Sequence, residues 1–196
     1  ITGPSASGKS ELAHKLLELF NDSIVLKTDS YYRDNFFIRL FSIFIYDIYD
    51  RIISIKKNQI NNTIHSIYNK DKLISLSNYD FRKKYSSQST IRINYNCDSQ
   101  FLIIEGIFSH RLDLNYQETI NIVCEEEKEV CLIRRLKRDK LERSRNYNEV
   151  NKKFNKSWDL FYLNINNHLK SNKVIYLNPV DKISYEKLIT KLKKIA

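Results

Sequence analysis

The stretch GPSASGKS, residues 3–10, determines how the rest of the chain is interpreted. Two glycines enclose four residues and are followed at once by Lys9 and Ser10, which is the G-x-x-x-x-G-K-[ST] spacing of a P-loop. Glycines let the backbone turn tightly, so that successive N–H groups point into one concavity that holds phosphate oxygens. The lysine would reach the β- and γ-phosphates of a nucleotide, and the serine hydroxyl would bind Mg²⁺. The residues expected to bind phosphate are Gly3, Ser5, Ala6, Ser7, Gly8, Lys9 and Ser10.

The residues before the loop are few. A simple glycine-rich turn that caps a helix would explain neither the lysine nor the serine. In a P-loop, a buried strand of about five residues leads into the turn. Only Ile1 and Thr2 precede Gly3, and the chain contains no methionine. We therefore expect that most of the first central strand is missing from this sequence.

The composition is that of an ordinary globular protein. The 196 residues are 42% apolar and 29% charged, which suits one domain over residues 1–196 with a sizeable core. The most apolar run, residues 36–50, is interrupted by Arg39, Asp47 and Asp50, and no stretch approaches the roughly 18 apolar residues of a membrane-spanning helix. The three cysteines form no C-x-x-C pair, which favours reduced thiols rather than a metal site. We expect a cytoplasmic protein without membrane association.

The net charge of +10 permits nucleic acid as a partner. The basic excess is, however, spread along the chain, and a protein that handles ATP and phosphorylated products also needs cations. We therefore do not expect nucleic acid as the main partner. The expected partner is a small molecule, and assembly into a homo-oligomer stays open.

Short apolar runs alternate with amphipathic segments along the chain. This alternation predicts an α/β fold, with a mostly parallel sheet flanked by helices and right-handed crossovers. Strands are expected at 23–30, 101–106, 120–124 and 173–177. Helices are expected at 11–20, 129–146 and 184–196, and residues 31–100 show only helical patches around 45–57.

Ligands of such sheets bind at the carboxyl ends of the strands, a rule that groups the P-loop, Asp29 and Glu105 at one edge. Asp29 could accept a proton from a substrate hydroxyl, or could equally stabilise a turn or a helix start. Glu105 could bind Mg²⁺ directly or through water, or could be an ordinary strand-end acid. The neighbouring Gly106, which permits a close approach to the loop, favours the functional interpretation of Glu105.

Residues 134–145, RRLKRDKLERSR, contain seven basic residues against Asp139 and Glu142. In a continuous helix Arg134, Arg138 and Arg145 would form one stripe. A solvated helix face is the common alternative for such a run. The excess of arginine over lysine favours phosphate binding, by a lid over about residues 134–150 that closes on ATP.

The ordered motifs GPSASGKS, TDSYY, SNYDF, FLIIEGIF, INIVCEE and EVCLIRRLKRDKLERSR together resemble the uridine kinase and phosphoribulokinase family of P-loop kinases. The similarity is thin between about residues 33 and 77. The resemblance implies a P-loop NTPase fold with an Arg-rich helical lid, and ATP (or GTP) with Mg²⁺ as the phosphoryl donor. In the uridine kinases of this family, the acceptor is the 5′-hydroxyl of uridine or cytidine.

Roles follow from the positions that match the family motifs. Asp29 becomes the candidate general base, with Lys9 and Arg138 as the other candidate catalytic residues. Glu105 and Ser10 become the candidate metal ligands. The lid residues expected at the nucleotide phosphates are Arg134, Arg138 and Arg143. The residues expected at the acceptor are Asp29, Tyr32, Tyr79, Phe81, Lys84 and Arg145.

Several departures from the family pattern fall on the acceptor side. Lys84 stands where uridine kinases usually have a histidine after Y-D-F, and the lid glycine is Ser144. An N-[FY]-D-H-P motif, whose aspartate holds the ribose hydroxyls in uridine kinases, is missing, and Asp47 or Asp50 would be an approximate substitute. Two alternatives therefore stay open beside a uridine or cytidine kinase. One is a kinase of another acceptor such as a sugar phosphate, which a lysine would suit, and the other is a non-catalytic nucleotide-binding protein.

Overall fold

The computed structural model describes residues 1–20, 22–45, 48–95, 101–112, 114, 119–143, 146–169 and 174–195, without the side chains of 142, 143 and 169. The helices are α1 (Lys9–Leu19), α2 (Phe36–Phe44), α3 (Lys57–Tyr68), α4 (Lys128–Arg143), α5 (Tyr147–Leu169) and α6 (Lys182–Lys193). The strands are β1 (Ile24–Lys27), β2 (Leu73–Asp80), β3 (Tyr85–Arg92), β4 (Leu102–Glu105), β5 (Asn121–Cys124) and β6 (Val174–Leu177). Short 3₁₀ turns cover Thr28–Tyr31, Ile48–Asp50, Ile52–Ser54 and Ser109–Arg111. None of the helices in these ranges is long and apolar enough to cross a membrane.

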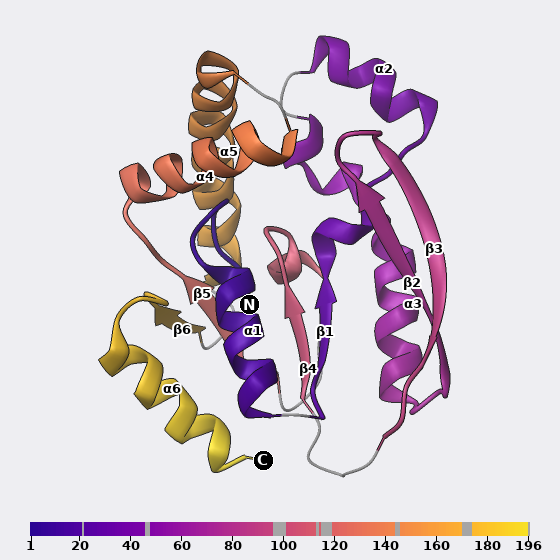
Figure 1. Ribbon diagram of the computed structural model, residues 1–196, viewed down its shortest axis with the longest axis vertical. Coiled ribbons are helices and arrows are strands. Elements are labelled where there is room, and N and C mark those ends of the chain that lie inside the picture. The colour runs from indigo at the N-terminus through magenta and orange to yellow at the C-terminus, as the bar shows by residue number, and fades with distance from the viewer. Residues whose placement is uncertain are drawn as a thin grey trace.

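A parallel layer runs through the centre of the molecule (Figure 1). Strand β1 pairs with β4 in parallel, and β5 pairs with β6 in the same sense. Ile1 and Thr2 lie between the two pairs: the Ile1 amino group donates to the Ile104 carbonyl at 2.7 Å, and the Thr2 amide donates to the Ile122 carbonyl at 2.8 Å. The order across the layer is therefore β1, β4, Ile1–Thr2, β5, β6, which confirms the expected α/β fold with parallel strands.

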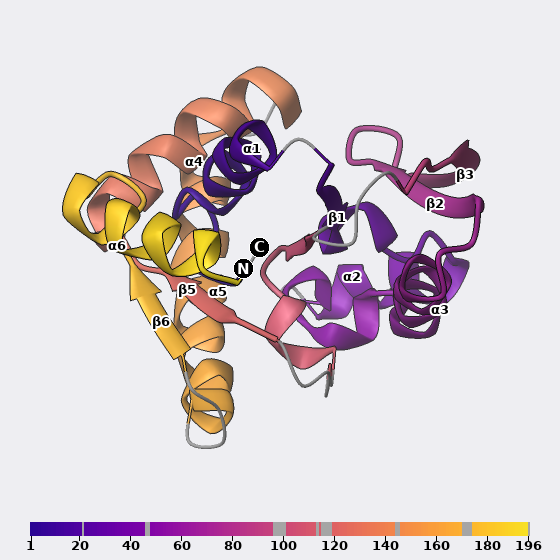
Figure 2. The same cartoon turned by 90° about the horizontal axis from the view of Figure 1, so that it is seen from below.

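Two apolar clusters cover the two faces of this layer. In one, Leu12 and Leu16 of α1 and Leu188 of α6 pack against alternate strand residues such as Ile122. In the other, side chains of α3 and α5 pack against the opposite face, which includes Val123. Neighbouring residues of β5 thus point to different clusters, as the two-residue repeat of a strand requires. Figure 2 shows α6 beside α1, with α3 at the opposite side of the molecule.

The hairpin of β2 and β3 is a separate antiparallel pair, in which Leu73 lies opposite Arg92 and Asp80 opposite Tyr85. It runs alongside α3 (Figure 1). Ile74 and Tyr79 of β2 are buried, whereas β3 is almost entirely exposed. Because the exposed strand has no alternation of apolar residues, its sequence carries little strand signal, and the hairpin was not expected.

Other differences from the expectations concern helices. The expected helical patch around 45–57 contains two 3₁₀ turns, and helix α2 lies before it at Phe36–Phe44. The expected helix over 129–146 is found as α4, which ends at Arg143, and the unexpected α5 begins at Tyr147. Closure of this region over a nucleotide, the lid function, stays a prediction.

Candidate active site

The loop of residues 3–8 curls between Thr2 and the start of α1, and Figure 1 shows it beneath α4. Gly8 has φ +88°, a left-handed conformation that favours glycine, and it precedes α1 with no side-chain cap on the helix. At Gly3, a Cβ atom would lie only 2.6 Å from the Cys124 carbonyl oxygen. Both glycines are therefore needed for the curl. The uncapped amides at the start of α1 form a site suited to an anion.

Lys9 lies inside the loop that it follows. Its ammonium Nζ donates a hydrogen bond of 2.7 Å to the Pro4 carbonyl across the loop, and the residue is buried. Burial lowers the pKa of Lys9, while the negative charges of Asp29 and Glu105 oppose that shift. A poorly solvated cation at this place would gain strongly from a phosphate oxygen.

Ser10 and Glu105 bring two oxygen donors together. The Ser10 hydroxyl donates to Glu105 Oε1 at 3.0 Å, and Glu105 is buried at the end of β4. Burial raises the pKa of the Glu105 carboxyl, and the charge of Asp29 acts in the same direction. The Lys9 ammonium and the hydrogen bond from Ser10 lower it.

These two donors fit Mg²⁺, which prefers oxygen ligands and is usually held by one or two protein groups together with water and substrate phosphates. No group of three or more His, Cys, Asp or Glu residues suited to a metal ion occurs within the described ranges. A cation at Ser10 and Glu105 would therefore need further oxygens from a phosphate or from water. That requirement matches a nucleotide-bound metal rather than a closed protein site.

Asp29 follows β1 in the 3₁₀ turn Thr28–Tyr31. The N-cap position of this turn is Lys27, and no side chain caps the turn there. Asp29 therefore does not have the alternative role of a helix cap. Gly106, next to Glu105, lets the ends of β1 and β4 come close, because a Cβ there would clash with the Thr28 hydroxyl and lie 3.2 Å from Asp29 Oδ1. The close approach of these two chain segments brings both carboxylates to one edge.

A cleft of about 280 Å³ opens at this edge of the sheet. The donor-side residues that line it are Ser5, Ala6, Gly8, Lys9, Ser10 and Glu105. The cleft is also lined by Asp29, Tyr32, Asp50 and Phe81, and by Arg134, Arg135 and Arg138 of α4. A larger, mostly apolar cavity of about 340 Å³ lies at the other ends of β4 and β5. We assign the candidate site to the smaller cleft, because the larger cavity contains none of the residues expected to bind or to react.

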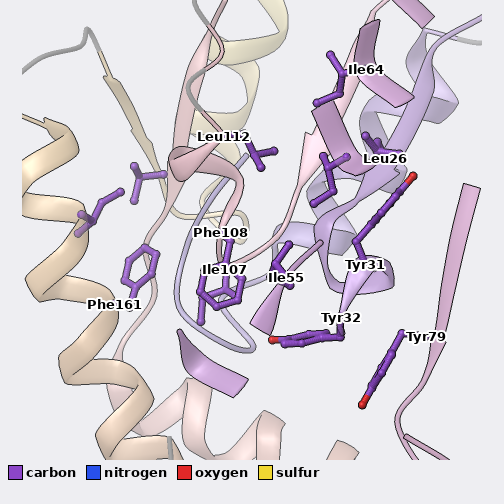
Figure 3. Packing of buried hydrophobic residues seen from close by; sticks show 13 residues of the cluster. Leu26, Tyr31, Tyr32, Ile55, Ile64, Tyr79, Ile107, Phe108, Leu112 and Phe161 are labelled. Atoms are coloured by element: carbon purple, nitrogen blue, oxygen red, sulfur yellow. The ribbon is translucent and has the colours of Figure 1, made fainter. Parts of the chain in front are cut away.

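Aromatic rings form one wall of the cleft. The ring centre of Tyr32 lies 5.4 Å from that of Tyr79 and 5.6 Å from that of Phe81, and the Tyr32 hydroxyl donates to the Tyr49 carbonyl at 3.0 Å. Tyr32 and Phe81 line the cleft, whereas Tyr79 is buried and packs behind them. Figure 3 shows Tyr32 beside Ile55, with Tyr79 on its other side. The ring centre of Phe108 lies 6.4 Å from that of Tyr32, so core side chains pack against this wall.

The remaining acceptor residues differ in their positions. Lys84 is exposed in the β2–β3 turn and is not among the residues found to line the cleft. Asp50, which the sequence offered only as an approximate substitute, is half-buried and lines the cleft. Asp47 and Arg145 lie outside the described residues, as does the side chain of Arg143. The roles predicted for Lys84, Arg143 and Arg145 stay predictions.

Sequence reasoning missed two residues beside the expected arginines of α4, namely Arg135 and Asp139. Arg134 pairs with Glu126 at 3.1 Å, and Arg138 pairs with Asp139 at 2.8 Å. Arg135, which also lines the cleft, and Asp139 are both buried. Their i,i+4 spacing is visible in the sequence, but it does not say which side of the helix is covered.

Comparisons with known proteins indicate one family. The sequence model of the Phosphoribulokinase / Uridine kinase family matches residues 1–182. A uridine kinase from Lactobacillus helveticus is 29% identical over 157 residues, which are 76% of this chain and 71% of that protein. A uridine kinase from Ureaplasma parvum serovar 3 is 30% identical over 159 residues, 76% of this chain and 72% of that protein.

Solved structures include that of a possible uridine kinase from Bacillus stearothermophilus, which matches with a TM-score of 0.56 and 13% sequence identity. The match covers 90% of this chain and 85% of the other, and it shows a shared fold. Fold, cleft and sequence similarity lead to the same assignment. The chain belongs to the phosphoribulokinase/uridine kinase family of P-loop kinases.

Proposed function

We propose that this kinase transfers the γ-phosphoryl group of ATP (or GTP), with Mg²⁺, to the 5′-hydroxyl of uridine or cytidine. One observation carries the proposal: a single cleft joins the Lys9–Ser10–Glu105 cluster of the P-loop edge to Asp29 and an aromatic wall. The first group suits a nucleotide triphosphate, and the second suits a neutral nucleoside with a reactive hydroxyl. Phosphoryl transfer needs both at one place.

On the donor side, the loop amides and the start of α1 would bind the phosphates. Lys9 would exchange its bond to the Pro4 carbonyl for a phosphate oxygen, which is a stronger, charge-assisted partner. Ser10 and Glu105 would hold Mg²⁺, which when bound neutralises charge on the transferred group. Arg134 and Arg138 would add positive charge from the α4 side of the cleft.

On the acceptor side, Asp29 would accept the proton of the attacking hydroxyl. It lies in the same cleft as Lys9 and Glu105, and its charge influences both. Tyr32 and Phe81 offer ring surfaces for a pyrimidine base. Asp50 is the carboxylate in this cleft that could accept hydrogen bonds from ribose hydroxyls.

The alternative of an anionic acceptor is motivated by the missing N-[FY]-D-H-P motif and by Lys84. That side chain belongs to the exposed hairpin turn rather than to the cleft lining, and the acceptor end of the cleft contains the carboxylates of Asp29 and Asp50. Carboxylates repel a phosphorylated sugar. These positions favour a neutral nucleoside, and the similarity to proteins described as uridine kinases agrees with it.

The test is ADP release by the purified protein with ATP and Mg²⁺ over a panel of acceptors. We expect release with uridine and cytidine, and little with purine nucleosides or pentose phosphates. Release with pentose phosphates alone would contradict the acceptor assignment while leaving the donor site intact. Binding of ATP without release for any acceptor would instead support a non-catalytic nucleotide-binding protein.

A further inference from the structure

Helix α4 contains a carboxylate that is completely withdrawn from solvent. Asp139 has no exposed surface, and Arg135, one helical turn before it, is only 5% exposed. A buried carboxylate is costly unless cations and hydrogen-bond donors surround it. The groups that surround Asp139 therefore indicate why it is there.

One oxygen of Asp139 holds Arg138. Asp139 Oδ1 accepts hydrogen bonds from Arg138 Nε at 3.0 Å and from Nη2 at 2.8 Å. The Arg138 side chain is one-third exposed, and Arg138 lines the cleft. A guanidinium has five N–H donors, so this pairing leaves about three of them for a ligand. The carboxylate fixes the inner edge of the guanidinium and leaves its outer edge available.

The other oxygen of Asp139 connects to helix α5. Asp139 Oδ2 lies 3.8 Å from Arg135 Nε, and Arg135 Nη1 donates to the Ser157 hydroxyl at 2.8 Å. The Arg135 guanidinium also lies 5.8 Å from the centre of the Phe154 ring. Ser157 and Phe154 are buried residues of α5. Through Arg135, the Asp139 carboxylate is therefore connected to α5 and not only to its own helix.

The two arginines beside Asp139 differ in their exposure. Arg135 is only 5% exposed, whereas the Arg138 side chain is one-third exposed and Arg138 lines the cleft. An arginine that binds phosphate benefits from being held in place before the ligand binds. Asp139 holds Arg138 in this way, through two hydrogen bonds to one carboxylate oxygen.

We propose that Asp139 is a positioning residue, which holds the Arg138 guanidinium toward the phosphates of a nucleotide in the cleft. The inference rests on the proposed function only in that a nucleotide binds there. Asp139 itself touches neither substrate nor phosphate. Its effect on binding or turnover should therefore act through Arg138 and disappear when Arg138 is removed.

The test is a double-mutant cycle of Asp139→Asn, Arg138→Ala and the two combined. The affinity for ATP with Mg²⁺ is measured by calorimetry without any acceptor, and kcat/KM is measured with uridine. We expect Asp139→Asn alone to lower kcat/KM or affinity about 10- to 100-fold. In the Arg138→Ala background, the same change should have almost no further effect. Equal effects of Asp139→Asn in both backgrounds would refute the positioning role and leave only a structural one.

Asp159→Asn is the matched control, because Asp159 has a 76% exposed side chain on α5 and pairs with Lys128 only at 4.0 Å. It should change neither affinity nor kcat/KM. Thermal unfolding of each variant separates stability from function, since a structural loss would persist in the Arg138→Ala background. If Asp139→Asn does not fold, Ser157→Ala replaces it in the cycle, because it removes the bond to Arg135 Nη1. A Ser157→Ala effect that is independent of Arg138 would also overturn the proposal.

The two proposals fail in different ways. A wild-type protein that binds ATP but releases no ADP with any acceptor would contradict the proposed function, while the affinity cycle would still decide the role of Asp139. An intact kinase whose Asp139 and Arg138 effects simply multiply would contradict only the positioning role. A wild-type protein that does not bind ATP would refute both.

Discussion

Gly106 offers a sharp test of how the site is assembled, because the absence of a side chain there lets the ends of β1 and β4 come close. The change is Gly106→Ala. The new Cβ would clash with the hydroxyl of Thr28, which is completely buried, and would lie 3.2 Å from Asp29 Oδ1. The residue also has φ +146°, a backbone angle that residues with a side chain rarely adopt.

The expected cost follows from these two effects. A strained backbone conformation costs about 1–3 kcal/mol, and forcing a methyl group into a packed site costs about 1–3 kcal/mol more. We therefore expect the free energy of unfolding to fall by roughly 2–6 kcal/mol, a large part of the 5–15 kcal/mol typical of a folded domain. Displacement of Asp29 by a fraction of an ångström should also lower kcat at temperatures where the variant remains folded.

Urea unfolding measures the first effect, and ADP release with uridine at low temperature measures the second. Thr28→Ala supplies the matched second change, because it removes the hydroxyl that the new methyl group meets. The combined variant should recover part of the stability lost in Gly106→Ala. A Gly106→Ala protein with wild-type stability and turnover would refute the close approach, and so would a double variant whose losses simply add.

Three further changes test individual residues of the cleft. Asp29→Asn should lower kcat by about 10²–10⁴-fold while ATP affinity is preserved; unchanged turnover would remove Asp29 as the base. Phe81→Ala should raise KM for the nucleoside and leave KM for ATP unaltered, and an equal rise of both would contradict its place on the acceptor wall. Glu105→Gln should stabilise the protein at neutral pH without ligand, because the folded-state pKa of Glu105 is raised. The wild type therefore loses stability as the pH rises through the ordinary value of 4.5 toward that higher pKa, and the variant does not. Urea unfolding from pH 4 to pH 7 measures the difference between the two proteins, and a difference independent of pH would exclude a raised pKa.

The donor half of the site could be predicted from the sequence because each of its residues adjoins a strong local signal. Lys9 and Ser10 follow a fixed glycine spacing, and Glu105 ends a short apolar run before a glycine. Asp29 follows another such run. Once the fold is parallel, these strand ends must meet at one edge. Local pattern and topology then determine the site together.

The acceptor half could not be predicted in the same way. Asp50 belongs to a 3₁₀ turn, and Phe81 and Lys84 belong to the turn of a hairpin whose second strand is polar and exposed. Neither element has an apolar repeat that marks its position. From the sequence, Lys84 is consequently expected at the acceptor and Asp50, beside Asp47, is only an approximate substitute, although of Lys84 and Asp50 only Asp50 lines the cleft.

For the arginines of α4, the pattern is visible in the sequence, but the position of each side chain depends on packing against another helix. Arg134, Arg135 and Arg138 all suit a phosphate, yet Arg135 is turned into the interface with α5 and binds Ser157. Helix α5 begins four residues after α4 ends, and the helical spacing of Val150, Phe154, Phe161 and Ile165 is a signal that the sequence analysis missed. All three arginines line the cleft, but the contact with the buried face of α5 holds Arg135 in place through Ser157. Chemistry on the donor side thus depends on packing against α5, and a change in that packing should alter nucleotide affinity without touching any residue of the loop.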